Sequence, residues 1–383
     1  MSENFTVDEA HLAGFSVLAD ELSTQAASLM GHINYEARPT QGFTGLMELL
    51  KPPVEQYAQA TGVRLANRVD RLTSISTELN RAAWMYSGAD KSAYEKFDDP
   101  RLPGTATGYK DFPNPASYPP GDEPKLKPPP HGEADIRALV DEVGGLINGV
   151  DDAIAALTTW SPVTELVEPM SGNWTELSRA GDVLTQVGDG AELVAGNLTS
   201  QLGTLDAYWN GGAAIAFQDY AGKIAQALEM EGPINRLVGQ VYKAVAGEIE
   251  KVAQFMVSTL KTAVDKVAQA AASSWIPGYG WYRIADAVRS AIDIIQEAYE
   301  LIRQLKNVID TVQTVVDAAQ NPVEFIEGKV EEQLAPIKEK VQQAEKGVNI
   351  AQDIAALKDA DALTDLPENK DYSVGENPRR PGG

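Results

Sequence analysis

The sequence predicts an all-α fold, with two antiparallel helical hairpins that form an elongated four-helix-type bundle, followed by a C-terminal helical extension and a disordered tail. The main observation is that long stretches place apolar residues at steps of three or four, a spacing that lines one face of a helix. The second is composition. Hydrophobic residues make up 43% of the 383 residues and aromatic residues only 7%, so Ala, Leu, Val and Ile fill most apolar positions. This mixture favours helix over strand.

The first hairpin is predicted within residues 1–98. Thr6-Val7-Asp8-Glu9 matches a capping box that opens a helix, and Gly31 is the predicted end of that helix. The following loop is rich in proline and glycine and contains a short helical turn at Leu46–Leu50. A second apolar stripe predicts a helix from about Val54 to about Phe97.

Residues 99–132 form the predicted linker between the two hairpins. Proline is so frequent there that neither a helix nor a sheet can form. The composition indicates a semi-rigid spacer, partly in the polyproline II conformation. Its Pro-x-x-Pro spacings leave one alternative, which is binding in a groove of a partner.

Helical periodicity resumes in residues 133–272. A first helix is predicted from Glu133 to about Thr159, and the second hairpin covers about residues 175–272. Gly232-Pro233 lies within the second arm of this hairpin. A proline there removes a helix hydrogen bond and clashes with the preceding turn, so we expect a kink or a break.

The turn of the second hairpin is Trp209-Asn210-Gly211, which separates two long apolar stripes. Asn210, Gly211 and Gly212 are the residue types that best tolerate the left-handed conformation at which helices end. We expect Trp209 to lie on the last turn of the first arm and to cover the end of the apolar seam.

Residues 273–358 predict the helical extension, and residues 359–383 are polar enough to predict disorder. The extension begins with an aromatic cluster and continues in a long near-heptad stripe from Ile284 to Val316. The stripe could form a homo-oligomer and the cluster could contact a membrane interface, or both could pack on the rest of the protein. The clustered aromatic residues are Trp275, Tyr279, Trp281 and Tyr282.

Charge and composition exclude several classes of function. A net charge of −23 repels the phosphates of nucleic acids and anionic lipid headgroups. The absence of cysteine excludes disulfides, zinc–thiolate sites and cysteine nucleophiles. The N-terminal sequence MSENFTVDEA has neither a basic nor an apolar region, so we predict no cleaved leader, and no apolar stretch predicts a membrane-spanning helix.

The sequence predicts no enzyme, no metal site and no cofactor. Its three histidines, His11, His32 and His131, lie far apart and belong to no metal-ligand motif. Nucleophile-elbow, phosphate-loop and dinucleotide motifs are absent from the sequence. Adjacent acids such as Asp151-Asp152 are typical of solvated helix faces.

The stretch AELVAGNLTSQLGTLDAYWNGGAAIAFQDYAGKIAQAL resembles the WXG family of small helical-hairpin proteins, which are substrates of the type VII (ESX) secretion systems of actinobacteria. The resemblance implies a second signal, Tyr-x-x-x-Asp/Glu, after the last helix of a hairpin. Tyr86 and Asp90 match it, and Tyr94 and Asp98 match it again. Residues four apart stack on one helix face, so the ring and the carboxylate would form one recognition patch.

The two signals lie in different hairpins, and this arrangement resembles a fused pair such as the larger Esp-type substrates. The resemblance implies that Tyr86 and Trp209 meet at one end of the bundle. It implies export without a cleaved leader to the cell surface or the medium, recognition by the type VII secretion ATPase or a chaperone, and a structural or effector-like role outside. It covers about residues 1–98 and 175–240 and implies little about residues 241–383.

Three other hypotheses remain open from the sequence. The helices of residues 241–320 could form a membrane-active or pore-forming oligomer. The chain could be a toxin-delivery module whose toxic domain lies elsewhere. It could also be a cytoplasmic helical scaffold.

Overall fold

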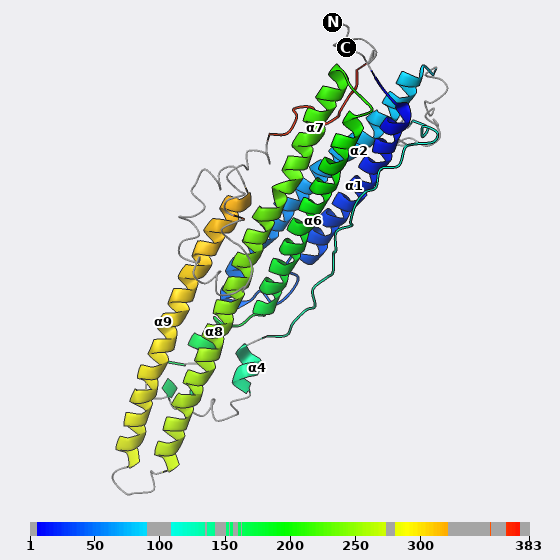
Figure 1. Ribbon diagram of the computed structural model, residues 1–383. Helices are drawn as coiled ribbons and strands as arrows, with labels where there is room; N and C mark the ends of the chain where they lie inside the picture. Colours follow the sequence, from blue (N-terminus) through cyan, green and yellow to red (C-terminus); the bar gives the residue numbers. More distant parts are fainter. Residues whose placement is uncertain are drawn as a thin grey trace, which may run out of the picture.

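The computed structural model describes residues 6–89, 109–134, 136–141, 151–152, 154–155, 160–161, 163–272, 280–320, 353 and 365–375. The protein is all-α, and the described part of the chain contains no β-strand (Figure 1). The elements are α1 (Glu9–Glu36), the 3₁₀-helix η1 (Gly45–Leu50), α2 (Lys51–Ser87), α4 (Ile136–Asp141), the π-helical turn η2 (Val163–Val167), α6 (Trp174–Asp206), α7 (Gly212–Glu229), α8 (Glu231–Ala272) and α9 (Gly280–Gln320).

Helix α1 differs from its prediction at both ends. Its N-cap is Asp8, whose carboxylate accepts a hydrogen bond from the N–H of Ala10 at 3.0 Å, so the predicted capping box at Thr6 is wrong. The helix also continues through Gly31, its predicted end, to Glu36. Ile33 beyond the glycine is fully buried, and this packing outweighs the helix cost of glycine, about 1 kcal/mol.

Helix α2 follows η1, which forms where the short helical turn was predicted. Prolines occupy its first turn, where their missing N–H groups would have had no helical partner. The helix ends at Gly88, whose φ of 78° is left-handed, so the predicted continuation to Phe97 is wrong at this point. Residues 90–97 lie outside the described residues.

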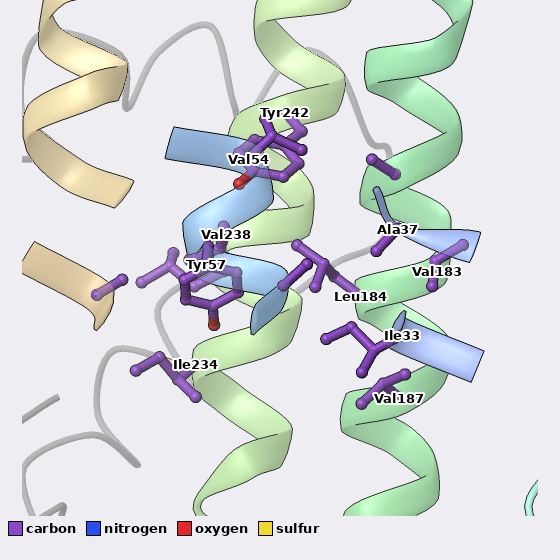
Figure 2. Packing of buried hydrophobic residues seen from close by; sticks show 14 of the residues in the cluster. Ile33, Ala37, Val54, Tyr57, Val183, Leu184, Val187, Ile234, Val238 and Tyr242 are labelled. Atoms are coloured by element: carbon purple, nitrogen blue, oxygen red, sulfur yellow. The ribbon is translucent and has the colours of Figure 1, made fainter. Parts of the chain in front are cut away.

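The core lies between α1, α2, α6 and α8. Helix α1 packs along α2 and also along α6, and α6 packs along α7 and α8. Figure 2 shows one section of this core, where side chains from all four helices point toward one another. The labelled residues of that section are Ile33, Ala37, Val54, Tyr57, Val183, Leu184, Val187, Ile234, Val238 and Tyr242.

Two pairs of glycines bring α6 and α8 unusually close together. A Cβ at Gly181 would lie 2.5 Å from the carbonyl oxygen of Gly239, and a Cβ at Gly188 would lie 2.7 Å from that of Gly232. Any larger side chain at these positions must push the two helices apart. The glycines therefore set the distance between α6 and α8.

The helix that follows the Trp209 turn breaks close to Gly232-Pro233, where a kink or break was predicted. Helix α7 ends at Glu229 and α8 begins at Glu231, with Met230 as the C-cap between them. Pro233 follows in the first turn of α8, where its missing N–H disturbs the helix least. The two helices together form one long arm beside α6 (Figure 1).

A buried ion pair joins α2 to the start of α8. Glu231 is fully buried, and its carboxylate accepts a hydrogen bond from Arg64 Nε at 2.7 Å. Arg68 lies nearby and is 2% exposed, and its burial lowers the pKa of the guanidinium to about 10, against the opposing attraction of Glu231. Removing one member of such a pair leaves the other buried and unpaired.

Residues 109–134 form an extended strap along the bundle (Figure 1). The N–H of Ala116 donates to the carbonyl oxygen of Ala10 in α1 at 2.8 Å. Further along, Asn197 and Arg179 of α6 donate to the carbonyl oxygens of Asp122 and Pro129 at 3.0 and 2.9 Å. Helices α1 and α6 thus supply hydrogen-bond partners, from their backbone and their side chains, to backbone groups of the strap that have no partner within a helix.

The C-terminal part of the described chain consists of helix α9 and the segment 365–375, and only the segment differs from its prediction. Helix α9 runs beside α8 and extends the molecule away from the end where α6 passes to α7 (Figure 1). Beyond Gln320, the predicted helical extension to residue 358 lies outside the described residues, apart from Asp353. The prediction of a disordered tail over residues 359–383 is wrong for residues 365–375, which pack on the bundle with Tyr372 only 5% exposed.

Candidate functional site

The candidate site is the end of the bundle at which α6 passes to α7. Of the turn residues, only Gly211 has a positive φ, 102°, and it forms the N-cap of α7. We predicted that Trp209 lies on the last turn of the helix before it. This is wrong, because α6 ends at Asp206 and Trp209 follows the helix. Its N–H still donates to the carbonyl oxygen of Leu205 at 3.1 Å, which holds the turn against the helix end.

The side chain of Trp209 is 1% exposed and closes the end of the core. Its ring lies 5.6 Å from the ring of Phe217 and 6.4 Å from that of Tyr86, between centroids. A large aromatic side chain contributes most of its stabilisation through buried area. Trp209 therefore joins the turn between α6 and α7 to the end of α2.

The N-terminal segment pairs with the turn, which the sequence did not indicate. The N–H of Asp8 donates to the carbonyl oxygen of Tyr208 at 3.0 Å, and the N–H of Asn210 donates to that of Thr6 at 3.1 Å. Asn210 Oδ1 in turn accepts from the N–H of Thr6 at 2.8 Å. Asn210 thus binds the N-terminal segment instead of supplying a left-handed residue, and Val7 forms an isolated antiparallel bridge with Trp209.

Tyr86 lies in the last turn of α2 and is 3% exposed. Burial raises the pKa of its hydroxyl above the ordinary value. The structure thus brings Tyr86 and Trp209 together, although Tyr86 lies in α2 and Trp209 follows α6. Asp90, Tyr94 and Asp98 lie outside the described residues.

The buried position of Tyr86 differs from the patch that the sequence predicts. A ring and a carboxylate four residues apart on an open helix face would both be accessible. Instead, the Tyr86 ring lies inside the core, and the exposed groups next to it in the chain are Ser87 and Gly88.

An aromatic network surrounds the turn, with Phe217 of α7 at its centre. The Phe217 ring lies 5.4 Å from Phe15 of α1 and 5.3 Å from Tyr372 of the C-terminal segment. Edge-to-face pairs at these distances add roughly 0.5–1.5 kcal/mol beyond area burial. Residues from α1, α7 and the C-terminal segment therefore meet at one ring.

The network continues to the strap through His11. Its ring stacks on Tyr208, with 3.4 Å between centroids and an interplanar angle of 8°. Its Nδ1 lies 3.0 Å from the hydroxyl of Tyr118, which packs edge-to-face on Phe15. The ring of His11 therefore packs between the turn and the strap and helps to hold them together.

The C-terminal segment 365–375 lies across the same end of the bundle. Arg71 of α2 donates to the carbonyl oxygens of Asn369 and Pro367, both at 3.0 Å. The N–H of Tyr372 donates to Ser74 Oγ at 2.9 Å. Apolar residues at alternating positions, Tyr372 and Val374, were the one local sign of this packing in a polar tail.

The start of α9, which carries Tyr282 of the predicted membrane or interface aromatics, lies at the opposite end (Figure 1). Trp275, Tyr279 and the side chain of Trp281 are outside what the structure describes. Tyr282 is 81% exposed near the start of α9 and lines a groove between α8 and α9 with Lys266 and Arg283. In the described part of the chain, no helix is long and apolar enough to cross a membrane.

Metal-ligating side chains form no cluster in the described residues. No group of three or more His, Cys, Asp or Glu side chains among them could hold a metal ion. His131 Nδ1 lies 2.9 Å from the buried carboxylate of Glu176, a pair that fixes the strap to the first turn of α6.

Comparisons of the chain with protein-family models, with curated proteins and with solved structures found no match.

Proposed function

We propose that this protein is a substrate of a type VII (ESX) secretion system that is exported folded and without a cleaved leader. In this proposal two helical hairpins, residues 1–98 and about 175–272, form a fused pair with a four-helix-type arrangement. The secretion ATPase or a chaperone recognises the end that carries both hairpin signals. Outside the cytoplasm the protein has a structural or effector-like role.

The contact between Tyr86 and Trp209 carries this proposal. Their ring centroids are 6.4 Å apart, although more than a hundred residues separate them in the sequence. Tyr86 begins one of the two Tyr-x-x-x-Asp matches, and Trp209 begins the Trp-x-Gly turn. Their proximity favours Tyr86 and Asp90 over Tyr94 and Asp98 as the export signal.

Export is tested by expressing the chain in a type VII secretion host, with and without the secretion ATPase, and by probing the culture filtrate. We expect the protein in the filtrate only when the ATPase is present. Undiminished export from the ATPase deletion strain would refute the proposal.

The choice of signal is tested with matched carboxylate variants in the same host. Asp90→Ala should lower the amount in the filtrate at least tenfold, whereas Asp98→Ala should leave it unchanged. Tyr86→Phe separates packing from recognition, because it keeps the buried ring and removes only the hydroxyl. The reverse pattern, with loss only in Asp98→Ala, would assign the signal to Tyr94 and Asp98.

A second candidate function rests on the exposed aromatic side chains of the α8–α9 hairpin. Tyr282 is 81% exposed, Tyr299 42% and Phe255 37%. Such side chains could insert into a membrane interface and support a membrane-active oligomer. Leakage from neutral phosphatidylcholine vesicles, measured together with the oligomeric state, distinguishes this function. A monomer that causes no leakage would exclude it.

A further inference from the structure

The segment Asp365–Gly375 lies on the bundle in the manner of a bound extended peptide. Tyr372 and Val374 are 5% and 3% exposed, while Asp371 and Ser373 between and beside them are exposed. This alternation is that of a strand with one face on a protein surface. The segment belongs to no helix of the described chain.

Side chains of α2 and α7, rather than a backbone ladder, hold the segment. Arg71 donates to the carbonyl oxygens of Pro367 and Asn369, and the hydroxyl of Tyr220 donates to that of Lys370. Among the described residues, no backbone–backbone hydrogen bond connects the segment to a helix. Side-chain clamps on a main chain, together with a side-chain anchor, are how grooves bind extended peptides.

The anchor of the segment is Tyr372. Its ring lies 5.3 Å from each of the rings of Phe217 and Tyr220, and its hydroxyl donates to the carbonyl oxygen of Ala213 at 3.3 Å. Burial, followed by the proximity of Tyr86, raises the pKa of this hydroxyl. The anchor thus occupies the same aromatic network as Tyr86 and the turn.

We propose that Asp365–Gly375 is a removable cover, an intramolecular peptide ligand. Its anchor Tyr372 closes the groove between Ser74 of α2 and Phe217 and Tyr220 of α7, close to the ring of Tyr86. A tethered ligand has an effective concentration of about millimolar, so modest intrinsic affinity keeps it bound while a competitor can still displace it. Opening the cover makes the aromatic end of the bundle accessible. The cover itself is independent of secretion, whereas its role in gating export rests on the proposed function.

The cover is tested with the full chain and a fluorescent peptide of sequence DLPENKDYSVG, by fluorescence anisotropy. In wild type the groove is occupied. If it is nine-tenths closed, the apparent affinity for the added peptide is about tenfold weaker than in an open chain. The full chain with Tyr372→Ala should therefore bind the peptide at least tenfold more tightly than wild type. Tyr35→Ala, which removes an 81% exposed tyrosine, should bind it as wild type does.

Two further measurements test the role of the Tyr372 anchor and the folding of the variant. A peptide with Ala in place of its tyrosine should not bind, because the anchor is missing. The circular dichroism of Tyr372→Ala should match that of wild type. Loss of helix in this variant would overturn the cover, because the segment would then be part of the core. A folded variant that fails to bind the peptide, or a wild type that binds equally well, would also overturn it.

Gating is tested by the export of Tyr372→Ala in the host with and without the ATPase. We expect ATPase-dependent export that is faster than that of wild type. Unchanged, ATPase-dependent export would refute gating and leave the proposed function intact. Export of wild type that does not require the ATPase would refute the proposed function and leave the peptide-binding result standing.

Discussion

Replacing Gly188 by alanine tests how closely α6 and α8 pack. The new Cβ would lie 2.7 Å from the carbonyl oxygen of Gly232 and 3.3 Å from its Cα, whereas ordinary contacts begin at 3.4 Å. Backbone atoms cannot rotate away as a flexible side chain can. The helices must therefore separate by roughly 0.7 Å at this point, the difference between 3.4 and 2.7 Å.

The expected change in the free energy of unfolding of Gly188→Ala is the sum of two opposing contributions. Overpacking of a tight core contact costs about 1–3 kcal/mol, while alanine gains about 1 kcal/mol over glycine in helix propensity. Gly188→Ala should therefore lower the free energy of unfolding by about 0–2 kcal/mol. Gly196→Ala in the same helix is the matched control, because a Cβ there meets nothing within 4 Å. It should raise stability by about 0.5–1 kcal/mol.

Urea unfolding followed by circular dichroism measures both variants against wild type. The two substitutions are chemically identical and lie on one helix, so a difference of about 2 kcal/mol reports the α8 contact alone. Equal stability of the two variants would refute the close approach of α6 and α8. Equal slopes against urea are needed for this conclusion, because a changed slope indicates a change in compactness.

Three other predictions concern the end of the bundle and its buried charges. Trp209→Ala should cost about 4 kcal/mol in thermal or urea unfolding, because the ring is 1% exposed and leaves a cavity. Glu231→Gln should cost about 3–5 kcal/mol by removing the fully buried carboxylate that pairs with Arg64, whereas Glu78→Gln in a partly exposed pair should cost less than about 1 kcal/mol. Alkaline pH should unfold the protein, because burial raises the pKa of Tyr118 to about 12 while the unfolded value is 10.0. The folded state then binds more protons between pH 10 and 12, so stability falls as pH rises, by about 2 kcal/mol for this group at pH 12. The lowered pKa of Arg68 acts in the opposite direction but is one group against several tyrosines. Absorbance at about 295 nm should show late ionisation coincident with loss of helix, and early, independent ionisation would contradict the buried positions. The other tyrosines with raised pKa values are Tyr57, Tyr86, Tyr220 and Tyr372.

Local patterns in the sequence predicted much of the helical structure. Apolar spacing identified the long helices, and Gly232-Pro233 marked the break that lies at Met230. The end of α1 was missed because a glycine was weighed by its local propensity, whereas Ile33 packs beyond it. Helix boundaries are decided by tertiary packing as well as by end signals, and a single sequence does not display that packing.

The irregular segments at the site could not be predicted, for a different reason. Thr6 pairs with Asn210, and Tyr372 packs on Phe217, across long separations in the sequence. Such contacts have no period along the chain, unlike a helix stripe. The polar composition around Tyr372 indicated disorder, yet a single aromatic anchor with side-chain clamps is sufficient to order a short segment once a groove exists.

The burial of Tyr86 limits how any partner can use it. Tyr86 and Trp209 are adjacent only in the folded chain, because α2 carries the one and the turn between α6 and α7 carries the other. Under the proposed function, the recognised feature is therefore a folded end rather than a linear motif, and unfolding would destroy it. Since both rings are almost fully buried, a partner must either contact the groups around them or open that end. Of the segments that cover it, the N-terminal one is fixed by backbone pairing to the turn, whereas residues 365–375 are held by side chains alone. The C-terminal segment is consequently the one that can leave without breaking a helix or a backbone bridge.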